Sequence, residues 1–172
     1  GAQGSMYSYE RANILAALEQ CTRYGVLTVT ALGLDRSTLF DDLRREQHAW
    51  KNPGAELCGV EQGISAPNGG PRDRLVKGLG PDQVYRPASP EEARQDVDKM
   101  VSEGTDLVKV WVEDFRNDVP NGKNYPKRSP TIYAAAIDEA DKHGKREAEH
   151  SHDLDVAETV GAGKDGRSAA GV

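Results

Sequence analysis

The stretch Leu107-Val108-Lys109-Val110-Trp111-Val112-Glu113 decides how this chain folds. Its residues alternate with a period of two, so one face of the predicted strand carries only valine and the other carries Lys109 and Trp111. Such a strand is typical of the interior of an α/β sheet, with its lysine directed at a site. An edge strand whose lysine faces water fits the same spacing equally well.

Start and stop signals of helices lie on both sides of this strand. Upstream, Ser89-Pro90-Glu91-Glu92 combines an N-cap serine, a first-turn proline and the glutamate of a capping box, and Gly104 ends the predicted helix. Downstream, Ser129-Pro130 repeats the start signal and His143-Gly144 repeats the stop signal. The order helix, strand, helix predicts βα units and parallel strands.

The same alternation of predicted helices and strands extends toward the N-terminus. Apolar periodicity predicts helices over 6–24 and 37–50, the second with Trp50 as the last candidate for its buried face, and strands over 26–32 and 56–62. Residues 63–88 form a long segment rich in glycine and proline, and such a loop is usually functional or mobile. We interpret residues 1–5 as a cloning scar and 6–172 as a single domain.

Several segments, taken in order, resemble the metal-dependent amidohydrolases, most closely their imidazolonepropionase-like branch. The segments are Ile64–Gly70, Arg86–Arg94, Gly104–Trp111, Ile137–Gly144 and His150–Asp153. The resemblance implies part of a (β/α)₈ TIM barrel with one or two divalent metals, such as zinc, at the carboxyl ends of its strands. It places Lys109 on the lysine that is often carbamylated to bridge two metals, and His150 on the histidine ligand of the fifth strand. His152 and Asp153 are neighbouring candidates. The implied chemistry is hydrolysis of amide or related bonds by metal-activated hydroxide.

The chain departs from the complete family pattern. A whole barrel needs about 250 residues, and this chain has 172. We therefore expect an α/β parallel sheet that does not close into a barrel within one chain. The family's histidine pair of the first strand and its histidine of the sixth are missing. The metal at Lys109 and His150 is accordingly expected to be absent or sub-stoichiometric. The alternatives are that Lys109 is a plain amine lining a cleft and that His150 and His152 are solvated.

Residues 145–172 break the apolar pattern. If Lys145–Ser151 is a strand with His150 directed inward, Glu147 and Glu149 point at the helix layer, where an unpaired carboxylate costs several kcal/mol. We expect the two glutamates to draw this segment out of the sheet into solvent, so that 145–172 is irregular or rearranged.

Composition limits the partners. The formal net charge is −6 and the basic residues are scattered, which argues against nucleic acid. No apolar run has membrane-spanning length and no signal peptide is present, and Cys21 and Cys58 lack metal-site spacing, so a cytoplasmic protein is expected. An incomplete barrel exposes strand edges and apolar faces, which predicts a homodimer or other self-association.

Three hypotheses follow from the sequence. The first is a shortened amidohydrolase-like protein that is folded but catalytically incomplete. The second is a hydrolase completed by oligomerisation. The third is a non-catalytic binding or structural module on the same scaffold, with a small-molecule ligand as one option. The first ranks highest, because function depends on the site and not on the fold.

Overall fold

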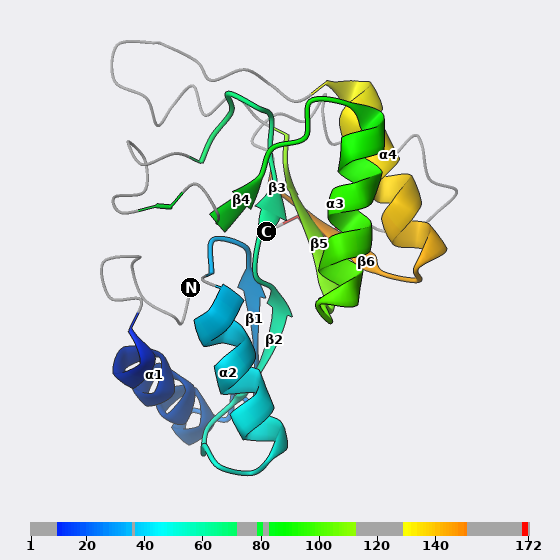
Figure 1. The fold of residues 1–172 in the computed structure, drawn as a ribbon. Coiled ribbons are helices and arrows are strands. Elements are labelled where there is room, and N and C mark those ends of the chain that lie inside the picture. The colour runs from blue at the N-terminus through cyan, green and yellow to red at the C-terminus, as the bar shows by residue number, and fades with distance from the viewer. Residues whose placement is uncertain are drawn as a thin grey trace, which may run out of the picture.

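The computed structural model describes residues 10–35, 37–71, 79–80, 83–112, 129–150 and 170–171. Helices and strands alternate along these ranges (Figure 1). In chain order they are α1 (Arg11–Arg23), β1 (Thr28–Leu32), α2 (Ser37–His48), β2 (Glu56–Val60), β3 (Gly63–Ile64), β4 (Val84–Tyr85), α3 (Pro90–Ser102), β5 (Leu107–Trp111), α4 (Pro130–Lys142), β6 (Arg146–His150) and β7 (Ala170–Gly171).

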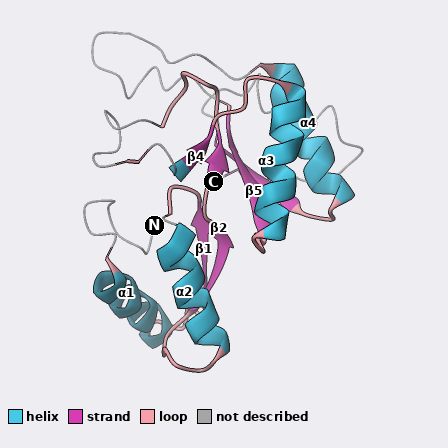
Figure 2. Cartoon of the chain, in the orientation of Figure 1, coloured by secondary structure: helices cyan, strands magenta, loops and turns pink. Residues whose placement is uncertain are grey.

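The strand pairs of the described part are parallel. β1 pairs with β2, and a second sheet has the strand order β4-β3-β5-β6-β7. Only Glu61 and Gln62 separate β2 from β3, so one segment passes from the first sheet into the second. Figure 2 shows α2 beside the first sheet and α3 and α4 beside the second. Within the described ranges neither sheet closes on itself, which confirms the predicted α/β fold of parallel βα units without a closed barrel.

β5 is the strand around which the larger core forms. Val108, Val110 and Val112 are almost completely buried, in a cluster with apolar side chains of α3 and α4. β3 and β6 lie on the two sides of β5, and Lys109 is only 2% exposed. The interior interpretation of this strand is therefore confirmed, and the edge-strand alternative is wrong.

The two helices beside β5 begin at the predicted serine-proline signals. Ser89 Oγ accepts a hydrogen bond from the Glu92 N–H at 3.2 Å, and the Glu92 carboxylate accepts from the Ala88 N–H at 2.7 Å. Ser129 is the N-cap of α4 but makes no capping bond, and its hydroxyl instead lies 2.9 Å from the Thr131 hydroxyl. None of the described helices is long and apolar enough to span a bilayer.

α1 and α2 cover the first sheet with a core of their own. Buried side chains of both helices pack with Val29, Ala31 and Leu57 of β1 and β2. α2 ends at His48, and Trp50 is 94% exposed, so its predicted inward position is wrong. Trp50 has a positive φ of 57° in the turn after the helix, which takes its side chain off the apolar stripe of α2.

The charged segment after α4 begins as a regular strand. Arg146–His150 pairs in parallel with Leu107–Trp111 over its whole length, and Ala148 is buried. The expectation that Glu147 and Glu149 draw these residues into solvent is therefore wrong. The backbone pairing with β5 outweighs the cost of turning two carboxylates toward the helix layer. Residues 151–169, which the same expectation covered, lie outside the described residues.

Candidate site at the carboxyl ends of the strands

Buried polar side chains gather near the carboxyl ends of the parallel strands. Ser65 follows β3 and is 2% exposed, and Asp35, in the segment after β1, is 4% exposed. Gln83, which directly precedes β4, is equally buried, and its side-chain amide donates to Leu34 O, in the segment after β1, at 2.7 Å. In α/β sheets this edge is where ligands bind. The sequence analysis did not single out these residues, because only the topology brings Asp35 and Ser65 to one edge and Gln83 into contact with the segment after β1.

Lys109 lies inside the same region, on the sheet face opposite the valines. Its Nζ is 5.6 Å from the centroid of the Trp111 ring, a cation–π contact. The Lys109 charge also acts on the carboxylate of Glu149 across the strand pair. The sequence predicted the direction of this side chain correctly, while its contact with Trp111 became visible only in the structure.

Two glycines make the space for this arrangement. A Cβ on Gly63 would overlap the Trp111 ring and come within 3.0 Å of Lys109 Cγ. A Cβ on Gly33 would lie 2.6 Å from Trp111 Cη2, and Gly33 also has a φ of +86°. The Trp111 indole therefore packs directly against the backbone of Gly33 and Gly63 on this face of the sheet.

His150 lies on the same face as Lys109. The register pairs Lys109 with Ala148 and Trp111 with His150, and side chains in register on parallel strands share a face. Lys109 and His150 are thus diagonal neighbours on adjacent strands. His150 is half-buried. His152 and Asp153, the neighbouring candidates, lie outside the described residues.

The loop after β3 is held by one guanidinium group. Arg86 Nη1 donates to Ala66 O at 3.0 Å and to Gly69 O at 2.8 Å, and Nη2 donates to Pro71 O. Inside the same loop the Ser65 hydroxyl donates to Gly70 O. Five donors in a planar fork suit Arg86 to such a cluster of carbonyl groups. This loop belongs to the Ile64–Gly70 segment of the resemblance.

Glu149 points away from the site, toward α4. Burial raises the pKa of this carboxyl group, and the nearby Lys109 charge opposes part of that rise. One of its oxygens, Oε1, is buried without a hydrogen bond to the described residues. Burial also raises the pKa of Tyr133 on α4, and the charge of Glu149 adds to that effect. Glu149 therefore occupies the helix-layer position that the sequence analysis considered only on the condition that this segment is a strand.

The described residues do not supply a complete two-metal centre at this edge. A catalytic zinc site normally has three protein ligands and an open position. Lys109 and His150 are two candidate donors, and the Lys109 amine rests against an indole ring. Among the described His, Cys, Asp and Glu side chains, the one group of three with metal-ligand spacing is Asp98, Glu139 and His143, which lies between helices.

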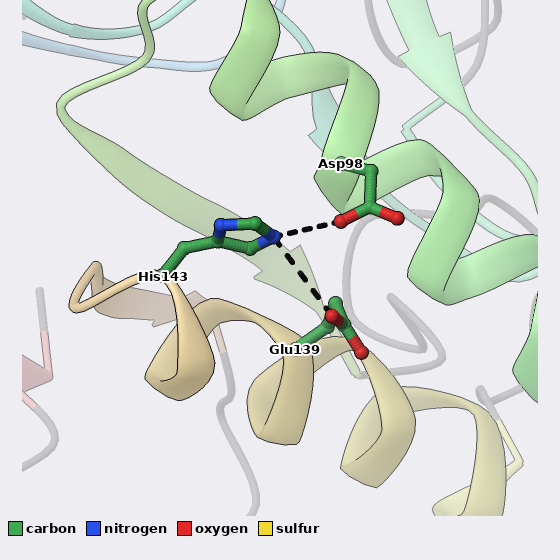
Figure 3. A group of neighbouring side chains, drawn as sticks. All are labelled: Asp98, Glu139 and His143. Atoms are coloured by element: carbon green, nitrogen blue, oxygen red, sulfur yellow. Dashed lines mark hydrogen bonds and ion pairs between the residues drawn. The ribbon is translucent and has the colours of Figure 1, made fainter.

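Asp98, Glu139 and His143 form a cluster that the sequence analysis missed. His143 Nε2 is 2.7 Å from Asp98 Oδ1 and 3.8 Å from Glu139 Oε1 (Figure 3). Glu139 and His143 are four residues apart, which places them on one face of a helix. That spacing was visible in the sequence, but Asp98 comes from α3 and is added only by the packing of the two helices.

Comparison with solved structures identifies the architecture. The structure superposes on a putative prolidase from Bifidobacterium longum with a TM-score of 0.65 at 20% identity, covering 90% of this chain and 34% of that one. It superposes on phenylurea hydrolase B with a TM-score of 0.65 at 21% identity, covering 88% and 38%. An amidohydrolase structure matches at 15% identity with a TM-score of 0.64, covering 88% and 39%.

The fold is amidohydrolase-like. At these identities the likeness concerns the fold alone, and the chain spans between a third and two fifths of the length of these structures. No protein-family model matches the sequence, and no curated protein matches it. In such a scaffold parallel strands run toward one edge, and Asp35 and Ser65 lie at that edge here.

Proposed function

We propose that this 172-residue chain is a shortened amidohydrolase-like protein that does not, by itself, hydrolyse amides or esters at a metal centre. The surroundings of Lys109 carry the proposal. The Lys109 residue is 2% exposed, and its amine lies 5.6 Å from the centroid of the Trp111 ring, so it rests against an indole and not within a set of metal ligands of the described residues. His150 is the other candidate donor that the described residues offer on this face, and two donors are fewer than the three protein ligands of a catalytic zinc site.

The second candidate function is a hydrolase whose site is completed by a further chain. The observation that favours it is the outer edge of β1, which has no partner strand in the described part. The third option, a non-catalytic binding module, would use the buried polar groups at the carboxyl edge for a small ligand.

Two further proposals concern the branch of the amidohydrolases that the chain resembles and its cellular location. The order of segments from Ile64–Gly70 to His150–Asp153 supports the imidazolonepropionase-like branch. The absence of metal-site or disulfide spacing at Cys21 and Cys58 supports a cytoplasmic location.

The decisive experiment combines turnover with the chemical state of Lys109. The chain is expressed with added zinc, manganese or iron and assayed with Xaa-Pro dipeptides, phenylureas and aryl esters. We expect no metal-dependent turnover, and an intact mass without an added carboxyl group on Lys109. Lys109→Ala should show the same lack of metal-dependent turnover as the parent. The control Lys51→Ala, at an exposed lysine, should show it as well. Metal-dependent turnover that Lys109→Ala abolishes and Lys51→Ala preserves would establish the second candidate instead.

A further inference from the structure

The loop after β3 carries a chemically reactive pair of residues, Asn68-Gly69, at its tip. Asn68 is exposed, whereas Gly69 and Ala66 are buried. Asparagine is a thermally labile residue. It reacts most readily before glycine, because glycine has no side chain to hinder attack by its backbone nitrogen on the asparagine amide. The tip of this loop therefore joins a reactive pair to the solvent that the reaction consumes.

The reaction of such a pair is a ring closure followed by hydrolysis. The Gly69 backbone nitrogen attacks Asn68 Cγ, and a new N–Cγ bond forms. The Cγ–Nδ2 bond breaks, and the side-chain amide leaves as ammonia with the proton of the Gly69 N–H. Water then opens the succinimide ring at one of its two carbonyl carbons. Attack at Cγ gives aspartate, and attack at the backbone carbonyl gives isoaspartate, whose main chain is longer by a methylene group. Both products carry a carboxylate where Asn68 had a neutral amide.

The folded loop holds the attacking nitrogen in a different arrangement. The Gly69 N–H donates to Ala66 O at 2.9 Å across a turn of the backbone. Among the described non-glycine residues, positive φ is confined to Leu34 and Trp50, so Asn68 has the negative φ of a type I turn. In such a turn ψ of this residue is about 0°, whereas ring closure rotates ψ and consumes the N–H. The hydrogen bond from Gly69 to Ala66 must therefore break before the ring can form.

Arg86 binds both ends of this turn. Its Nη1 donates to Ala66 O at 3.0 Å and to Gly69 O at 2.8 Å. Ala66 O thus accepts one hydrogen bond from within the loop and one from the guanidinium group, which comes from the segment after β4. Loss of that group raises the population of local openings in which the Gly69 N–H is released.

We propose that Asn68 is a deamidation site and that Arg86 sets its rate by controlling how often the loop opens. The reaction proceeds from the open loop. Isoaspartate cannot restore the same turn, because its added methylene lengthens the main chain between Ala66 and Gly69. A transient opening is thereby converted into a permanent one, beside the buried Ser65 at the carboxyl edge of the sheet. The new carboxylate changes the charge at this edge whether or not the chain hydrolyses a substrate.

The test follows Asn68 by peptide mass spectrometry while the full chain is kept at mildly alkaline pH. We expect the folded parent to convert Asn68 at least about tenfold more slowly than the same chain in denaturing guanidinium chloride. Arg86→Ala should speed the conversion in the folded state at least about fivefold. Arg86→Lys keeps the charge but loses the planar fork, and it should also speed the conversion. Arg23→Ala, at an exposed arginine of α1, should leave the rate unchanged. Circular dichroism checks that each variant is folded.

Two other asparagines serve as references in every sample. Asn52 precedes Pro53, which has no N–H and cannot close this ring, so position 52 should stay unchanged. Asn121-Gly122 is a second pair of the same kind, outside the described residues, and its rate corrects for differences between samples. Equal rates for Asn68 in the folded and the denatured parent would overturn the proposal. So would folded Arg86→Ala and Arg86→Lys variants in which the Asn68 rate, relative to that of Asn121, equals the rate in the parent.

Discussion

Val110 of β5 and Glu149 of β6 lie opposite each other in register, on the sheet face that α4 covers. Val110 is 2% exposed within the larger core, and its neighbour is a carboxylate with one buried oxygen that has no hydrogen bond to the described residues. In β6, a charged side chain therefore occupies a position at which the fold places apolar side chains. Such a conflict weakens a fold beyond the loss of a single contact.

Replacing Glu149 by Gln should stabilise the chain and remove one pH dependence. Burial raises the pKa of Glu149 in the folded state. Between the unfolded and the folded pKa the folded chain therefore holds more protons, so stability is highest at low pH and falls as pH rises through this window. Because the side chain is only half-buried, we expect a gain for Glu149→Gln of at most about 1 kcal/mol at neutral pH.

Urea unfolding at several pH values measures this effect. The difference between parent and Glu149→Gln should shrink toward acidic pH, where Glu149 is protonated in both states. The control Asp138→Asn, at an exposed position of α4, should show no such convergence. A gain that grows as pH falls would show that Glu149 is stabilising as a carboxylate.

Adding a methyl group at Gly63 should destabilise the fold through Trp111. The new Cβ would overlap the indole ring, and either the ring or β3 would have to move. Overpacking of this kind costs about 1–3 kcal/mol. Chemical denaturation of Gly63→Ala measures the loss, and the double variant Gly63→Ala/Trp111→Leu should recover part of it. Equal losses in the single and double variants would mean that Trp111 is not the obstacle.

The elements that were predicted from sequence are those whose signals are local. Ser89-Pro90 and the valine alternation of 107–112 fix α3 and β5, because caps and period-two patterns act over a few residues. Trp50 was misplaced since one turn residue with positive φ redirects its side chain, and helical periodicity carries no information about that turn.

The candidate site was predictable only in part for a different reason. Lys109 and His150 could be placed on one face from alternation and the order of strands. Arg86, Asp35 and Gln83 make their contacts to segments far away in sequence, so no local pattern marks them. β6 was judged from its charges alone, whereas five residues of backbone pairing with β5 decide its structure.

The chain is expected to self-associate. The outer edge of β1 has no partner strand in the described part, and the turn before it exposes Tyr24, Val26 and Leu27. An unpaired edge beside exposed apolar side chains favours pairing with a second copy. Light scattering at tens of micromolar should report a dimer, and Leu27→Lys should shift it toward monomer, while Trp50→Ser serves as a control away from the edge. A parent chain that stays monomeric contradicts the prediction.

Arg86 should control the order of the loop after β3. Its guanidinium group is the shared donor for the carbonyl groups of Ala66, Gly69 and Pro71, and these groups would be left without that donor in Arg86→Ala. Buried acceptors that lose their donor cost about 1–3 kcal/mol. We expect Arg86→Ala to lose stability in this range and to speed hydrogen exchange at Ser65 and Gly69.

Arg86→Lys should recover little, because one ammonium cannot reach three carbonyl groups in the plane of a fork. Added guanidinium ion at low millimolar concentration should restore slow exchange in Arg86→Ala, whereas equal sodium chloride should not. If Arg86→Lys behaves like the parent, or guanidinium has no effect, positive charge or packing holds the loop, and the fork of hydrogen bonds does not.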